Sequence, residues 1–134
     1  MFLEVKNVTK SYGESDSYIQ VLKGVSMGLD KGQICVVLGP SGSGKSTLLN
    51  VIGGLDTVNA GQILIDGQNI VKFSAKKTAR YRRKYLGFVF QFYNLIPNLT
   101  LRENIQVCQY LSHNPLDIDE LLDILDLTQH QNKY

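Results

Sequence analysis

The segment that most constrains this chain is residues 39–46, Gly-Pro-Ser-Gly-Ser-Gly-Lys-Ser. It fits the pattern G-x-x-x-x-G-K-[ST] at every fixed position. An apolar run at residues 34–38 precedes it, and a helical pattern begins at about Lys45. A buried strand, a glycine-rich turn and a helix in this order predict an α/β fold with a phosphate-binding loop.

The residue types in this loop have a chemical reason. Glycines let the backbone turn tightly and direct successive N–H groups at an oxyanion, and the helix that follows favours negative charge at its N-terminus. We expect Lys45 to reach the β- and γ-phosphates, Ser46 to bind Mg²⁺ and Thr47 to hydrogen-bond the α-phosphate. A chance glycine-rich turn is the alternative, and the flanking strand and helix patterns argue against it.

Composition excludes several other classes of protein. Hydrophobic residues make up 43% of the 134 residues, which is enough for a core. The formal net charge of +2 is too small to argue by itself for nucleic-acid or membrane-surface binding. No apolar run has the length of a membrane span, and the first residues lack a secretory pattern. Cys35 and Cys108 form no metal or disulfide pattern, so we expect two reduced, core-facing thiols in a cytosolic protein.

The first third of the chain reads as strands, and the helix that begins at about Lys45 is expected to stop at Gly53-Gly54. Residues 2–8 and 18–27 read as strands around a polar loop at 11–17, and residues 34–38 read as a strand buried on both faces of a parallel sheet. The Asp66-Gly67 pair predicts a hairpin between residues 62–65 and 68–71.

Helical patterns dominate the rest, with one further strand. Ser74 is expected to cap a short basic helix that ends near Lys84, and residues 88–90 to form another buried strand. A capping box at residues 100–103 and a second cap at Asp117 predict two helices after that strand.

Some thirty residues of strand-like sequence precede the phosphate loop, and with its flanks the whole chain resembles the ATP-binding domain of an ABC transporter. Ser11-Tyr12-Gly13 is similar to the adenine-stacking loop of that family, and residues 39–47 to its Walker A motif. Residues 88–91 resemble the strand that ends at the Q-loop glutamine. Residues 86–100, with Glu103-Asn104, are most similar to the branch that powers lipoprotein release, macrolide export and antimicrobial-peptide export or resistance.

The resemblance implies a set of site residues. ATP would be bound by Tyr12, Gly39, Pro40, Ser41, Gly42, Ser43, Gly44, Lys45, Ser46 and Thr47. Lys45 and Gln91 would act in catalysis, and Ser46 and Gln91 would hold Mg²⁺. An ordinary loop aromatic at Tyr12 and a plain strand-end polar residue at Gln91 are the alternatives.

The resemblance also implies a fold: an α/β P-loop NTPase core of ABC type with an antiparallel β subdomain and the beginning of a helical subdomain. The β subdomain and core would occupy about 1–91, and the Q-loop and start of the helical subdomain about 92–134. The signature, the Walker B Asp, the catalytic Glu and the switch His have no candidates in residues 1–134. We therefore expect a truncated, N-terminal part of one ATP-binding domain that is inactive as an ATPase on its own.

The implied function is that of an ATP-binding subunit that couples ATP binding and hydrolysis to export or membrane extraction of a peptide, lipoprotein or drug. Its partners would be a transmembrane permease subunit or domain and a second ATP-binding domain, in a homodimer at the cytoplasmic face of the cell membrane. An apolar cluster, Phe92, Tyr93, Leu95 and Ile96, is either local core or a cleft for the permease.

Other interpretations stay open. A soluble ABC ATPase of DNA repair or translation, a P-loop kinase, and a catalytically dead nucleotide-binding fragment all contain a phosphate loop. The basic residues at 72–84 favour a solvated helix face over nucleic-acid binding, and no nucleic-acid partner is expected. His113 and His130 lack ligand partners at metal spacing and are expected at the surface.

Overall fold

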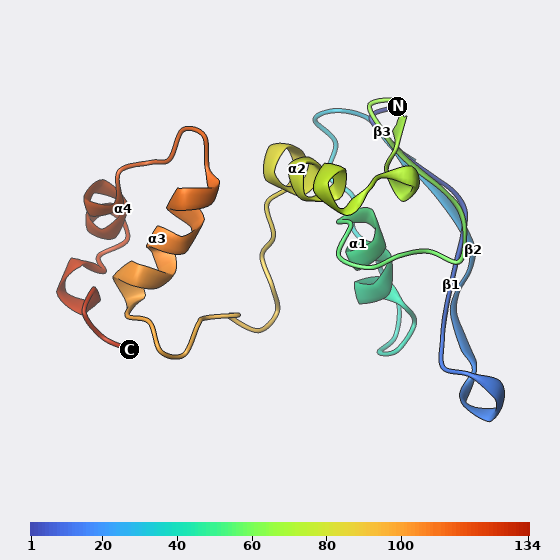
Figure 1. Cartoon of the computed structure of the whole chain (residues 1–134), viewed down its shortest axis with the longest axis horizontal. Helices are drawn as coiled ribbons and strands as arrows, with labels where there is room; N and C mark the ends of the chain where they lie inside the picture. The colour runs from blue at the N-terminus through green and yellow to red at the C-terminus, as the bar shows by residue number, and fades with distance from the viewer. The chain divides into compact units, whose positions relative to one another are not determined.

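The computed structural model describes all 134 residues and groups them into two compact units, Met1–Leu86 and Gly87–Tyr134 (Figure 1). The first unit holds a four-stranded antiparallel sheet with strand order β2-β1-β3-β4, and two α-helices. The second unit holds helices and irregular segments. None of the helices is long and apolar enough to cross a membrane.

The sheet is built on a long hairpin of β1 (Leu3–Tyr12) and β2 (Ile19–Leu29). Its register runs from Leu3 opposite Leu29 to Tyr12 opposite Ile19, and a short 3₁₀ helix, Ser15–Ser17, lies at the turn. Both predicted strands are confirmed. β1 extends beyond the predicted end because Tyr12 and Ile19, two good strand formers, pair across the hairpin.

A second hairpin follows, of β3 (Ala60–Ile65) and β4 (Gln68–Asn69). The predicted turn at Asp66-Gly67 is confirmed, with φ values of 48° and 75° that match a type I′ turn. β4 is shorter than predicted because the Asn69 side chain accepts a hydrogen bond from the Val71 N–H and starts a 3₁₀ helix, Ile70–Lys72.

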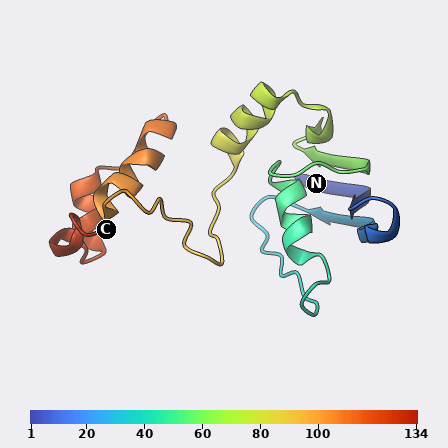
Figure 2. The same ribbon diagram turned by 60° about the horizontal axis from the view of Figure 1, so that its bottom comes forward.

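Helices α1 (Lys45–Ile52) and α2 (Ala75–Tyr85) cover one face of this sheet (Figure 2). Leu48 and Val51 of α1 and Tyr81 of α2 belong to the same buried cluster as the inward side chains of β1 and β3. As predicted, α1 ends at Gly53-Gly54, and the Ser74 hydroxyl caps α2 by accepting from the Lys77 N–H at 3.3 Å. Tyr81 is the one buried side chain of α2, and the basic residues of this helix lie outside the core.

The second unit contains α3 (Leu101–Leu111), α4 (Ile118–Ile124) and a 3₁₀ helix, Thr128–His130. Both predicted caps are confirmed: Thr100 and Glu103 form a capping box, and Asp117 accepts from the Glu120 N–H at 2.9 Å. Ile118 and Leu122 are the buried apolar side chains of this unit.

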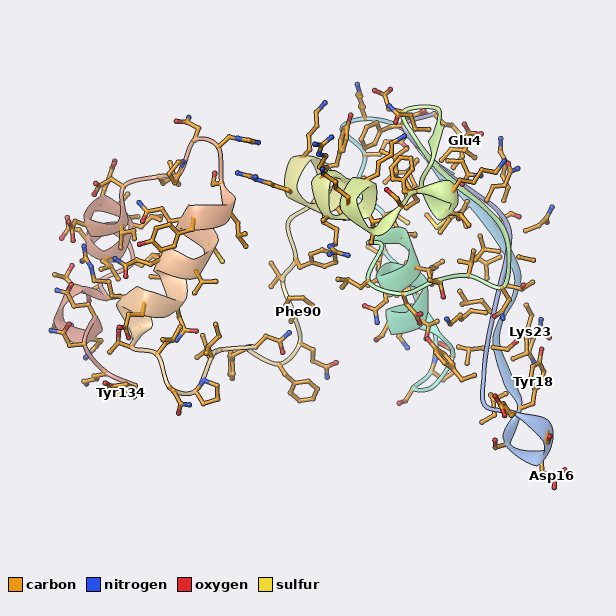
Figure 3. All side chains as sticks on the ribbon, viewed as in Figure 1. Glu4, Asp16, Tyr18, Lys23, Phe90 and Tyr134 are labelled. Carbon is orange, nitrogen blue, oxygen red and sulfur yellow. The ribbon has the colours of Figure 1, made fainter.

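Two predicted strands are wrong. Residues 34–38 and 88–90 are irregular, and Ile34 is 94% exposed. The ring of Phe90 lies on this irregular segment (Figure 3). A strand buried on both faces needs partner strands at its edges and helices over both faces. All the strands of residues 1–134 belong to the antiparallel sheet, so neither run has a partner.

The two cysteines also differ from expectation. Cys35 and Cys108 are exposed rather than core-facing. Cys35 belongs to the apolar run that forms no strand, and Cys108 lies on α3, which has no buried side chain.

Tyr81 connects the two helices of the first unit and gives a stability prediction. Its buried hydroxyl donates to the Ile52 carbonyl at 2.8 Å, at the C-terminal end of α1. Because Tyr81→Phe leaves that carbonyl without its donor, we expect a loss of about 1 kcal/mol in unfolding free energy, measured by urea denaturation.

Tyr85→Phe is the matched control, since Tyr85 is an exposed tyrosine on the same helix. Tyr85→Phe should leave the urea concentration at the unfolding midpoint almost unchanged. Equal midpoints for Tyr81→Phe and wild type would show that the buried hydrogen bond contributes nothing.

Candidate functional site

The glycine-rich loop turns into α1 directly on top of β2. Gly44, the residue before the helix, has φ of 93°. A Cβ at this position would lie 2.9 Å from Val21 Cγ1 and 3.2 Å from the Val21 carbonyl oxygen. Backbone conformation and space therefore both require glycine here, and the loop is held against the strand.

Lys45 is the first residue of α1, and its side chain folds back over the loop. Its ammonium donates to the Gly39 and Pro40 carbonyl oxygens, each at 2.7 Å. None of the ion pairs of the chain includes Lys45, so no carboxylate neutralises this charge. The loop thus surrounds a cation whose only acceptors are neutral.

The N-terminus of α1 adds further donors. The first hydrogen bond of the helix runs from the Leu48 N–H to the Gly44 carbonyl at 2.8 Å. The N–H groups of Lys45, Ser46 and Thr47 come before this bond and have no partner within the helix. Gly44 has no side chain that could cap them. Ser46 is exposed at the same end. Backbone donors, an ammonium and a hydroxyl therefore gather around one loop, an arrangement suited to an anion.

Tyr12 lies near this loop, at the end of β1. Its hydroxyl donates to Asp56 Oδ2 at 2.6 Å and also lies next to the Thr47 hydroxyl. The hydrogen bond to Asp56, and then burial, raise the pKa of Tyr12 above its ordinary value. Tyr12 as a whole residue is 43% exposed. The structure thus brings together the predicted residues Tyr12 and Thr47, which are far apart in the sequence.

Lys10 and Asp56 are polar neighbours of this site that the sequence analysis missed. Lys10 Nζ lies 2.8 Å from Asp56 Oδ1 and 4.9 Å from the centre of the Tyr12 ring. Burial by itself would raise the pKa of Asp56. The hydrogen bonds from Lys10, Tyr12 and the Thr57 N–H outweigh it, so that the pKa lies below its ordinary value. A signal existed for Lys10, because it lies at an inward position of β1 where a charge needs a partner.

Gln91 belongs to the second unit, in an exposed irregular segment. The neighbouring cluster of Phe92, Tyr93, Leu95 and Ile96 is exposed as well, so the local-core interpretation of this cluster is wrong. The Asn104 side chain holds the end of the segment by accepting from the Ile96 N–H and donating to the Leu99 carbonyl. His, Cys, Asp and Glu form no cluster of three or more that could hold a metal ion.

Comparisons with known proteins agree with this geometry. Residues 22–134 match the family model described as "ABC transporter". The chain is 41% identical over 134 residues to a putative ABC transporter ATP-binding protein, the MG065 homolog of Mycoplasma pneumoniae. It is 45% identical over 103 residues to the lipoprotein-releasing system ATP-binding protein LolD of Alcanivorax borkumensis, and 45% over 103 residues to the bacitracin export protein BceA of Halalkalibacterium halodurans.

A solved structure shares the fold. The ATP-binding cassette MJ0796, in a dimeric post-hydrolysis state bound to ADP and phosphate, aligns with a TM-score of 0.84 and 34% identity over 97% of this chain. The chain spans 60% of that cassette, 45% of LolD and 29% of the mycoplasma protein. The fold is therefore that of an ABC cassette, represented here by its antiparallel sheet and helices. The chain belongs to the ATP-binding domains of the ABC transporter family, in the branch of the lipoprotein-release, macrolide and bacitracin export proteins.

Proposed function

We propose that the first unit binds the triphosphate of ATP at the glycine-rich loop, and that the protein couples ATP binding and hydrolysis to export or membrane extraction of a peptide, lipoprotein or drug. The observation that carries this proposal is the position of Lys45. Its ammonium lies over the loop with two carbonyl oxygens as acceptors and no carboxylate partner. A phosphate oxygen is a stronger acceptor than a carbonyl because it is charged.

The backbone supports the same ligand. Gly39, Pro40, Ser41, Gly42, Ser43 and Gly44 would surround the phosphates, while the free N–H groups of α1 donate to them. Lys45 would exchange its carbonyl acceptors for β- and γ-phosphate oxygens. The Thr47 hydroxyl would bond the α-phosphate, which fits its place in the first turn of α1.

The donor chemistry of the site fits Mg²⁺ brought in by the nucleotide. Ser46 offers an exposed hydroxyl oxygen at the loop, and the family resemblance implies that the exposed Gln91 would add an amide oxygen. Magnesium prefers oxygen ligands, and it is commonly held by one or two protein groups together with phosphates and water. When bound, the ion would neutralise phosphate charge. Lys45 would stabilise the transferred phosphoryl group, and Gln91 would orient the attacking water.

Tyr12 would supply the surface for the adenine ring. An exposed, hydrogen-bonded aromatic ring beside Thr47 is suited to stack on a base, since stacking uses the flat face of the ring. The hydrogen bond to Asp56 supports this role over that of an ordinary loop aromatic, because it holds the exposed ring in one orientation.

The partners proposed for the whole protein are a transmembrane permease subunit or domain and a second ATP-binding domain, at the cytoplasmic face of the membrane. The exposed apolar cluster of Phe92, Tyr93, Leu95 and Ile96 supports a docking surface for the permease. The dimeric form of the related cassette MJ0796 supports a homodimer.

A second candidate is a nucleotide-binding unit without its own hydrolytic activity. The observation in its favour is that residues 1–134 contain no strand that ends in an acidic pair of the Walker B type. Binding and hydrolysis are therefore tested separately.

The Lys45→Ala variant tests the phosphate site. Loss of a charge-assisted hydrogen bond to phosphate should weaken ATP binding by about 1.5–3 kcal/mol. Titration with a fluorescent ATP analogue measures the affinity. Equal affinities for wild type and variant would remove Lys45, and with it the phosphate loop, from the proposal.

Base recognition is tested with ATP and GTP in parallel. Stacking is largely indifferent to base identity, so the two affinities should lie within about tenfold, and Tyr12→Ala should weaken both by about 1–2 kcal/mol. Strong preference for one base that survives Tyr12→Ala would show that another group reads the base.

Hydrolysis is tested by phosphate release under saturating MgATP. The 134-residue chain should release phosphate no faster than Lys45→Ala, because a missing general base costs about 10²–10⁴ in rate. Turnover that Lys45→Ala abolishes would mean that residues 1–134 contain a general base in another sequence context.

A further inference from the structure

Asp56 connects to the proposed base site through both of its carboxylate oxygens. Oδ2 accepts from the Tyr12 hydroxyl at 2.6 Å, and Oδ1 accepts from Lys10 Nζ at 2.8 Å and from the Thr57 N–H at 2.7 Å. One side chain therefore holds an exposed aromatic ring and a buried cation at once.

The backbone brings Asp56 to this place. The segment that follows α1 turns back towards β1, where the Asn59 N–H donates to the Thr9 carbonyl at 2.9 Å. Asn59 Oδ1 also accepts from the Ser11 N–H at 2.7 Å, next to Tyr12. At the other end of the segment, the Asp56 N–H donates to the Asn50 carbonyl of α1. Asp56 is thus tied both to the helix that carries the phosphate loop and to the strand that carries the ring.

Lys10 explains why the carboxylate is needed. Only 7% of this residue is exposed, and a buried ammonium requires a counter-charge, which Asp56 supplies. The ammonium lies 4.9 Å from the centre of the Tyr12 ring, within the range of a cation–π contact. The cation occupies one side of the ring, while the exposed part of the ring stays open to a ligand.

We propose that Asp56 is a positioning residue for nucleotide binding, which with Lys10 fixes the Tyr12 ring as a platform for the base. This inference rests on the proposed function of ATP binding. A ring whose hydroxyl is held and whose face is covered has lost its rotational freedom before the ligand arrives. Binding then does not have to order it. The Tyr12 hydroxyl also lies next to the Thr47 hydroxyl, in the first turn of α1.

The test compares ATP with inorganic tripolyphosphate, which occupies the phosphate loop without a base. Tyr12→Phe keeps the aromatic ring and the Asp56–Lys10 pair but loses the hydroxyl. We expect about fivefold weaker ATP binding, the scale of the cost of ordering one side chain on binding, and tripolyphosphate affinity within about twofold of wild type. Asp56→Asn should show the same split between the two ligands. If Asp56→Asn does not fold, Tyr12→Phe alone decides.

Tyr18→Phe is the matched control, because Tyr18 lies on the same hairpin and its hydroxyl bonds Ser11 Oγ at 2.8 Å (Figure 3). It should bind both ligands as wild type does. Unchanged ATP affinity in Tyr12→Phe, or an equal loss for ATP and tripolyphosphate, would overturn the positioning role. If wild type binds ATP no more tightly than tripolyphosphate, the positioning role of Asp56 is overturned as well. The phosphate site would still be supported in that case. Wild type that binds neither ligand would overturn the proposed function itself.

Discussion

The contact between Gly44 and β2 is the constraint on which the site depends. A side chain at this position would collide with Val21, so the loop can lie on the strand only because residue 44 has none. From that contact α1 runs with Leu48 and Val51 turned into the core, which sets the direction of its axis. The free N–H groups of Lys45, Ser46 and Thr47 lie at the start of this helix, next to the loop. Tyr12 lies on β1, the strand that pairs with β2.

Lys10 and Lys45 of the first unit lie in different surroundings, which give one a structural role and leave the other available to a ligand. Lys10 is buried, paired with Asp56 and unavailable to a ligand. The pKa of Asp56 is held below its ordinary value, so this pair contributes stability at neutral pH that is lost only as the pH falls below about 4, through the folded-state pKa. Lys45 has carbonyl acceptors and no carboxylate, so its charge is available to a phosphate. The charge of Lys10, which lies against the Tyr12 ring, is therefore neutralised, whereas the charge of Lys45 is not.

Features with local causes could be predicted from the sequence. The Asp66-Gly67 turn, the caps at Ser74, Thr100 and Asp117, and the start of α1 after the glycine-rich loop each depend on residues a few positions apart. Features with distant causes could not. Residues 34–38 and 88–90 have the composition of buried strands, but a strand also needs neighbours, and composition does not supply them. The Tyr12–Asp56 contact joins residues 44 positions apart, and no spacing rule indicates it.

In the proposed function, the glycine-rich loop and the first turn of α1 bind the phosphates of ATP. The most direct measurement follows the backbone amide resonances of the ¹⁵N-labelled chain while MgATP is added. Phosphate binding at the loop predicts saturable shifts at Gly42, Gly44, Lys45, Ser46 and Thr47 with one common dissociation constant, and a shift at Tyr12 with the same constant. Resonances of these residues that stay in place while others shift, or that do not respond at saturating MgATP, would contradict it.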